Sequence, residues 1–373
     1  QSVNKEFGEK LVIYAHKLGI NDIYIHDKNL IAKHELLKTI KIEDIENNSI
    51  FSDSIFDTYA KKNANFLMIE SEIPDLMKDI DPDKIAKMGF IARKTKPIFR
   101  EKEVNDLIPW CICAYPNEKW AQEIFPNDKC AYQKLYNSIM KMCMVDTKDP
   151  CKSWDEYITN SVARINKLNN LGIKKLHYSN SLGTDLFIEM PNDSLWCGAA
   201  NNKDMIVNMP SYEIFSSPNY LKTNGIVYNS KPLFYSGKKI DGFWIKFRDG
   251  KVIDFDAKEG KEILKGIINS DSNSCYLGEV SLVNNDSPIS NTHLVFGTTL
   301  IDENAACHLA LGDGFSECIK DGDKLNKEEL LEHGINKSTN HVDFMIGTGD
   351  LLIEIETKKG NMVLFENGNF KDM

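Results

Sequence analysis

The strongest constraint on the fold is a change in the apolar pattern near the middle of the chain. In the first 150 residues, stretches with helical spacing alternate with short apolar runs. Helices are predicted over residues 7–18, 30–39, 51–62 and 82–94, and strands over 22–26, 65–70 and 110–115. Strands that alternate with helices indicate a mostly parallel sheet covered on both faces, so an α/β N-terminal domain is expected over residues 1–150.

The pattern differs after residues 154–170, whose apolar spacing predicts a connecting helix. Short apolar runs bounded by turn residues follow, and Asp249-Gly250 between two of them is a hairpin signal. These runs lie at residues 174–178, 186–190, 205–209, 225–228, 243–247, 252–255, 351–356 and 362–365. We therefore expect a β-rich α+β C-terminal domain over residues 151–373.

The charge and the cysteine content of the chain exclude several classes of function. The net charge of −10 argues against binding to nucleic acid or to an anionic membrane surface, and it suits a protein that binds cations. The nine cysteines are irregularly spaced and form no Cys-x-x-Cys pair, which excludes a zinc ribbon or a thioredoxin-like motif. No signal peptide or membrane-spanning run is found. These features predict a cytoplasmic protein with reduced thiols.

Two imidazoles and three carboxylates in the second half form the best candidate site. The set consists of Glu213, Glu279, His308, His341 and Asp343. His341-Val-Asp343 would point both side chains to one face of a strand. Together the five can hold two divalent metal ions, and two metals that share a water form a hydrolytic site. Taken singly, these residues have simpler structural interpretations. His341 and Asp343 could be a surface pair, His308 a core histidine bonded to a backbone carbonyl, and Glu213 and Glu279 solvated carboxylates.

Several long motifs in a fixed order carry a family resemblance. They lie at residues 178–186, 196–198, 208–218, 277–283, 286–290, 299–312 and 341–347. With these motifs, the chain resembles the aminopeptidase T and aminopeptidase S family of dinuclear metallopeptidases, the thermophilic-type leucyl aminopeptidases. The resemblance covers nearly the whole chain and is densest from Tyr178 onward.

The resemblance implies an activity and a set of roles. The family positions that match the five residues bind a pair of metal ions, and a set without a thiolate is compatible with zinc, cobalt or manganese. The implied reaction releases N-terminal amino acids from short peptides, in a homodimer. Glu279 is the first candidate to accept the proton of the attacking water; Glu303 is the alternative, or it orients His308 from behind.

Two departures from the family pattern matter. The family places an active-site tyrosine seven residues after the histidine that matches His308, and here that position is Phe315. If its hydroxyl stabilises the oxyanion, the loss costs about 10²–10³ in rate, unless Tyr212, Tyr228 or Tyr276 substitutes. The alternative is a catalytically impaired homologue that binds metal or peptide, or a dimeric scaffold. Family chains also begin with a further helix and strand, so a trimmed chain or a smaller N-terminal sheet is expected.

Overall fold

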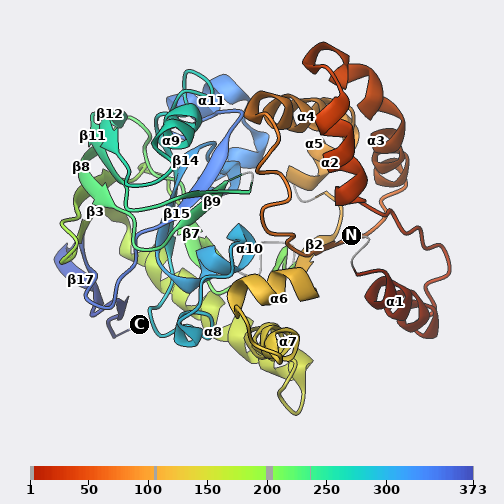
Figure 1. The fold of residues 1–373 in the computed structure, drawn as a ribbon. Coiled ribbons are helices and arrows are strands. Elements are labelled where there is room, and N and C mark those ends of the chain that lie inside the picture. Colours follow the sequence, from red (N-terminus) through yellow and green to blue (C-terminus); the bar gives the residue numbers. More distant parts are fainter. Residues whose placement is uncertain (1–3, 105–106, 199–204, 236, 373) are drawn as a thin grey trace. The chain divides into compact units, whose positions relative to one another are not determined.

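The chain forms two compact units, Gln1–Ile139 and Met140–Met373, in the computed structural model (Figure 1). The structure describes residues 4–104, 107–198, 205–235 and 237–372. Among these residues, no helix combines the length and the apolar character that crossing a membrane requires.

The division lies earlier than the boundary predicted between residues 150 and 151. The Trp154 indole donates to the Cys143 carbonyl at 2.8 Å, and the Tyr212 hydroxyl donates to the Met142 carbonyl at 2.6 Å. These bonds attach the segment after Ile139 to the second unit. Local apolar patterning gives no sign of them, because both are bonds from side chains to backbone carbonyls and the second joins residues 70 positions apart.

The first unit alternates helices with two strands. The Asn29 side chain accepts from the Ala32 amide at 2.9 Å and begins α2, and Asp81 with Pro82 begins α4 in the same way. The two strands pair in parallel, as expected. The elements are α1 (Lys5–Lys17), α2 (Leu30–Thr39), α3 (Ile45–Lys61), β1 (Phe66–Glu70), α4 (Pro82–Lys94), α5 (Pro97–Val104), β2 (Trp110–Ala114), α6 (Glu118–Ile124) and α7 (Ala131–Met142), which crosses the division.

Two expectations for this unit are wrong. Residues 22–26 form no strand, and Tyr24 and Ile25 are 50% and 54% exposed. Alternation alone cannot hold a strand, because the backbone groups also need a partner ladder. The strands β1 and β2 are only partly buried rather than buried on both faces, and Leu67 is 54% exposed.

The second unit consists mainly of two antiparallel sheets. One has the strand order β12-β11-β8-β4-β3-β16-β17-β18, and the other β15-β14-β13-β7-β5. The hairpin predicted at Asp249-Gly250 joins β11 to β12. The strands of the larger sheet are β3 (Ile173–Ser179), β4 (Asp185–Glu189), β8 (Thr223–Tyr228), β11 (Trp244–Arg248), β12 (Lys251–Asp256), β16 (Leu352–Thr357), β17 (Gly360–Glu366) and β18 (Asn369–Phe370).

The smaller sheet and the helices complete the unit. The helix α8 (Pro150–Leu171) follows the expected stretch and ends at Gly172, whose φ of 59° is the left-handed conformation that glycine adopts without strain. The smaller sheet contains β5 (Cys197–Gly198), β7 (Ile214–Ser216), β13 (Leu277–Leu282), β14 (His308–Gly312) and β15 (His341–Met345). Apart from short 3-10 helices, the other elements described in this unit are β6 (Asn208–Met209), β9 (Leu233–Tyr235), β10 (Lys238–Ile240), α9 (Lys261–Ile268), α10 (Thr299–Asp302) and α11 (Lys327–Glu332).

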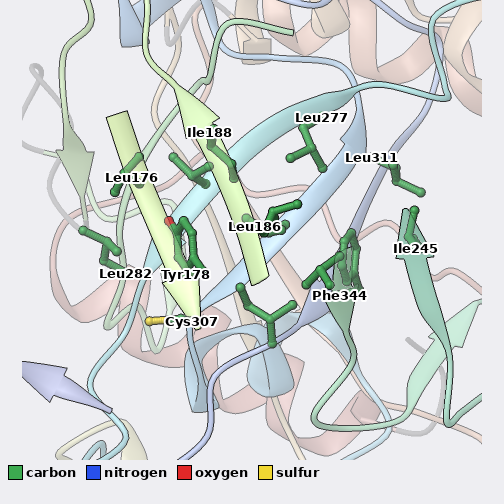
Figure 2. Close-up of a cluster of buried hydrophobic side chains, with 14 of the residues drawn as sticks. Leu176, Tyr178, Leu186, Ile188, Ile245, Leu277, Leu282, Cys307, Leu311 and Phe344 are labelled. Carbon is green, nitrogen blue, oxygen red and sulfur yellow. The ribbon is translucent and has the colours of Figure 1, made fainter. Parts of the chain in front are cut away.

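The core of this unit lies between the two sheets (Figure 2). Leu176 and Leu186 from the larger sheet, and Leu277, Leu311 and Phe344 from the smaller one, belong to one buried cluster. Since side chains alternate along a strand, the smaller sheet can cover the core with one face and present different residues on the other. That second face carries the candidate site.

Candidate metal centre

All five predicted ligands lie on one face of the smaller sheet. Pairing across β13, β14 and β15 sets Glu279 opposite Ala310, and Ala310 opposite Asp343. His308 and His341 are two residues away from Ala310 and Asp343 along their strands, so they share this face. Glu213 lies just before β7, two residues from Phe215, which pairs with Ser281 on the same face of β13.

A bulge turns Glu279 towards the site. Leu277 pairs with Leu311 and Val280 pairs with Leu309, and all four side chains lie in the core. Regular alternation would place one residue between the core positions Leu277 and Val280, but two lie there, which is a β-bulge. The extra residue is Gly278. A Cβ there would lie 2.1 Å from the Asp313 carbonyl oxygen, so only glycine allows this backbone approach.

The five side chains form two groups that share one carboxylate. Glu279 Oε1 lies 3.7 Å from His308 Nε2, and Glu279 Oε2 lies 3.1 Å from His341 Nε2. Glu213 Oε2 lies 3.1 Å from His308 Nε2, and Asp343 Oδ1 lies 3.1 Å from His341 Nε2. The groups are therefore Glu213–Glu279–His308 and Glu279–His341–Asp343, each with its ligand atoms within 4.8 Å of one another.

Backbone carbonyls fix the tautomer of both imidazoles. His308 Nδ1 lies 2.9 Å from the Glu303 carbonyl oxygen, and His341 Nδ1 lies 2.7 Å from the Asp313 carbonyl oxygen. A carbonyl only accepts, so Nδ1 carries the proton in each ring. In the neutral rings this leaves the Nε2 lone pairs directed at the carboxylates, as metal ligation requires.

The donor set fits divalent cations. His308, Glu279 and Glu213 are 1%, 4% and 8% exposed, and burial of several carboxylates together is costly without a compensating charge. Asp343 Oδ1 is buried and, despite its 3.1 Å approach to His341, makes no aligned hydrogen bond. Nitrogen and oxygen donors without a thiolate suit zinc, cobalt or manganese.

The charges of the site shift its pKa values when no metal is bound. Burial opposes protonation of His308 and His341, but the neighbouring carboxylates outweigh it and raise both pKa values well above the usual range. Burial acts to raise the pKa of Asp343, but the charge and close approach of His341 together with the charge of His308 outweigh it and lower that pKa. Burial, followed by the charges of Glu213 and Asp343, raises the pKa of Glu303 well above its ordinary value.

Glu303 acts on His308 differently from the expectation. Its backbone carbonyl, rather than its carboxylate, accepts the His308 Nδ1 proton. The carboxylate Oε1 instead accepts from the amides of Asn208 at 3.3 Å and Asn304 at 3.4 Å. It is 8% exposed and within electrostatic reach of Glu213, Glu279 and Asp343, so this carboxyl group borders the site without belonging to either ligand group.

Phe315 lies directly beside the site. Its ring centroid is 5.0 Å from that of His341 and 5.2 Å from that of Phe215, and both phenylalanines are partly exposed. The tyrosines considered as substitutes have other contacts. The Tyr212 hydroxyl donates to Met142, Tyr276 packs its ring against Tyr220 at 5.3 Å, and Tyr228 is part of β8 in the larger sheet.

Sequence patterning left out three residues that shape the site, namely Gly278, Ala310 and Asp313. Ala310 is fully buried between Glu279 and Asp343, where its small side chain leaves room beside the carboxylates. Its position two residues after His308 would have placed it on the ligand face. Gly278 and Asp313 had no comparable local signal, because their roles depend on how separate segments pack together.

Comparison with known proteins shows the family of the chain. The family of thermophilic metalloproteases (M29) matches residues 1–370, and the chain belongs to this family. It is 39% identical over 318 residues to "Aminopeptidase 2" of Geobacillus stearothermophilus, covering 83% of this chain and 77% of that protein. It is 33% identical over 376 residues to "Aminopeptidase AmpS" of Bacillus subtilis (strain 168), covering 98% and 91%.

A solved structure shows the same fold. Wild-type AmpT from Thermus thermophilus matches with a TM-score of 0.89 at 24% identity, over 98% of this chain and 91% of that one. The mixed α/β architecture, with a parallel strand pair and antiparallel sheets, is therefore a known one.

Proposed function

We propose that the protein is an aminopeptidase that uses two divalent metal ions to release N-terminal amino acids from short peptides. The observation that carries the proposal is Glu279, whose two oxygens face the two imidazoles at 3.7 and 3.1 Å. A shared carboxylate between two three-residue groups is the arrangement that a pair of adjacent ions needs. Membership of the metalloprotease family and the aminopeptidase names of the relatives support it.

The residues of the chain have distinct tasks in this proposal. Bound at the site, the ions would polarise the scissile carbonyl and lower the pKa of a water. Glu213 with His308 would hold one ion, His341 with Asp343 the other, and Glu279 both. The two backbone carbonyls behind the imidazoles keep the rings in the ligating tautomer.

Two carboxyl groups can take the proton from the water, and the geometry favours Glu303. Both oxygens of Glu279 point at imidazoles, so neither is free if this residue bridges the ions. Glu303 borders both groups, and its carboxyl lies outside them. A proton acceptor that is not itself a ligand can move its proton without releasing an ion.

The direct test is release of free amino acids from a panel of di- to pentapeptides. With added cobalt or zinc we expect release from the amino end, and none after removal of metal by a chelator. Peptides with an acetylated N-terminus serve as the control, because an aminopeptidase requires the free amine. Cleavage of the acetylated peptides at the same rate, or release that a chelator leaves unchanged, contradicts the proposal.

A second prediction concerns the space beside Ala310. In Ala310→Leu, the larger side chain would enter the region between Glu279 and Asp343, so we expect loss of bound metal and of activity. Overpacking would also lower the free energy of unfolding by about 1–3 kcal/mol. Metal content by elemental analysis checks the prediction, with Ala310→Ser as the size-matched control. Full metal content in the leucine variant contradicts it.

A non-catalytic homologue is the second candidate function, because Phe315 places a ring without a hydroxyl 5.0 Å from His341. The homodimer and the cytoplasmic location stay predictions.

A further inference from the structure

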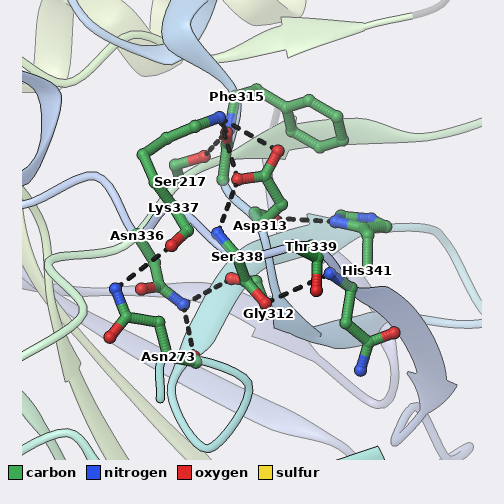
Figure 3. Close-up of polar contacts among 12 residues, drawn as sticks. Ser217, Asn273, Gly312, Asp313, Phe315, Asn336, Lys337, Ser338, Thr339 and His341 are labelled. Atoms are coloured by element: carbon green, nitrogen blue, oxygen red, sulfur yellow. Dashed lines mark hydrogen bonds and ion pairs between the residues drawn. The ribbon is translucent and has the colours of Figure 1, made fainter. Parts of the chain in front are cut away.

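The His341 side of the site is bordered by the end of β14 and the short segment that follows it, residues 312–315. This segment contacts His341 twice, through the Asp313 carbonyl at Nδ1 and through the Phe315 ring (Figure 3). The backbone here is closely packed. A Cβ on Gly312, whose φ is 105°, would lie 2.1 Å from the Asn340 carbonyl oxygen, and the Gly278 bulge adjoins the Asp313 carbonyl.

An ion pair holds this segment from the outside. Lys337 Nζ lies 2.8 Å from Asp313 Oδ1 and 2.9 Å from Oδ2, and it also donates to the Gly314 carbonyl at 3.0 Å. The Lys337 and Asp313 side chains are only 20% and 34% exposed. By contrast, the Lys324–Asp321 pair is 69% and 55% exposed, and pairs of that kind contribute little to stability.

The same residue, Asp313, connects the ion pair to the imidazole. Its carboxylate accepts from Lys337 and from the Ser338 amide at 3.0 Å, while its carbonyl accepts from His341 Nδ1 at 2.7 Å. Rotation of the Asp313 peptide unit would direct the carbonyl away from His341. Lys337 opposes that rotation, because its ammonium group binds the Asp313 carboxylate and the Gly314 carbonyl at the same time.

Other hydrogen bonds join the segment of residues 312–315 to the loop of residues 336–340 without Lys337. The Asp313 amide donates to the Asn340 carbonyl at 2.6 Å, and the Gly314 amide donates to the Asn336 carbonyl at 2.8 Å. The Asp271 carboxylate further anchors the loop by accepting from the Ser338 hydroxyl and the Thr339 amide. The Gly314 amide and the Asp313 carbonyl belong to the same peptide unit, so Lys337 strengthens a restraint that the bond to Asn336 already supplies. Removal of the lysine charge should therefore leave the loop folded and loosen the orientation of this peptide unit.

We propose that Lys337 and Asp313 form a positioning pair that fixes the His341 imidazole for its metal ion, a role that rests on the proposed two-metal function. Neither Lys337 nor Asp313 belongs to the two ligand groups. The pair acts through the Asp313 carbonyl, which holds the proton on Nδ1 and sets the plane of the ring. Groups of this kind, placed behind a ligand, commonly change metal affinity by about 10–100-fold.

The test measures cobalt binding directly, because the visible spectrum of Co²⁺ reports the ligand geometry. In Lys337→Met we expect one of the two cobalt equivalents to bind about 10–100-fold more weakly, with a changed spectrum. The other equivalent keeps the affinity of the natural chain. Lys337→Arg, which retains the charge and the donors, should restore both affinity and spectrum. Lys324→Met is the matched control for loss of a surface lysine and should behave as the natural chain.

Melting temperatures of the metal-free proteins separate positioning from a structural role. We expect Lys337→Met and Lys324→Met to melt within a few degrees of each other. Unchanged cobalt affinity and spectrum in Lys337→Met overturn the proposal. So does weaker binding of both equivalents together with a large drop in melting temperature. If the natural chain binds no cobalt, the proposed function itself fails, whereas normal cobalt binding without peptide hydrolysis leaves the positioning role intact.

Discussion

Replacement of Glu279 by glutamine is expected to abolish the metal pair and to reduce turnover by at least about 10³-fold. The side chain keeps its size, but one oxygen becomes an amide nitrogen that cannot ligate a cation. In the structure each Glu279 oxygen faces a different imidazole, so the substitution removes the oxygen ligand from one three-residue group and the negative charge from both. Metal catalysis supplies several kcal/mol of stabilisation in the transition state, and about 4 kcal/mol corresponds to 10³-fold in rate.

Two further variants make this test specific. Glu303→Gln should retain the metals and lose turnover, because the Glu303 carboxyl lies outside both groups and is proposed to accept the proton. Glu354→Gln, on an exposed position of β16, should change neither. Metal content and kcat are measured for all three. Full metal content in Glu279→Gln would rule out the bridging role, and loss of metal in Glu303→Gln would make that residue a ligand.

The part of the site that could be predicted from the sequence is the part set by strand periodicity. His341 and Asp343 are two residues apart, and β15 does direct both to the same face. Helices α2 and α4 of the first unit were predicted with their observed bounds, since apolar spacing and a proline in the first turn are local signals, whereas α5 was not predicted. The grouping of all five residues relied on the family resemblance, and the structure brings them together.

The features that could not be predicted depend on contacts between distant segments. Glu213 meets His308 only because β7, β13 and β14 are neighbours, an order that no local pattern specifies. The bulge at Gly278 requires the Asp313 segment to pack against it. Likewise, the alternation at residues 22–26 failed to give a strand, because no partner pairs with it in the described part of the chain.

Phe315→Tyr is expected to raise kcat by about 10²-fold with little change in metal content. The ring already lies beside His341, so tyrosine adds one hydroxyl at the edge of the site without any repacking of a ligand. A hydroxyl that donates to the developing oxyanion contributes about 10²–10³ in rate. KM should change less than kcat, since this bond forms mainly in the transition state.

The neighbouring ring provides the matched control. Phe215 is partly exposed, packs against Phe315 at 5.2 Å and shares the face of the sheet that carries the ligands. Phe215→Tyr therefore adds a hydroxyl in similar surroundings but not at the position of the family tyrosine, and we expect no comparable gain. A gain confined to Phe315→Tyr means that the metal site is intact and lacks one donor. If kcat does not rise at normal metal content, either another group already stabilises the oxyanion or the chain binds peptides without cleaving them. Release of amino acids from peptides by the natural chain distinguishes these two explanations.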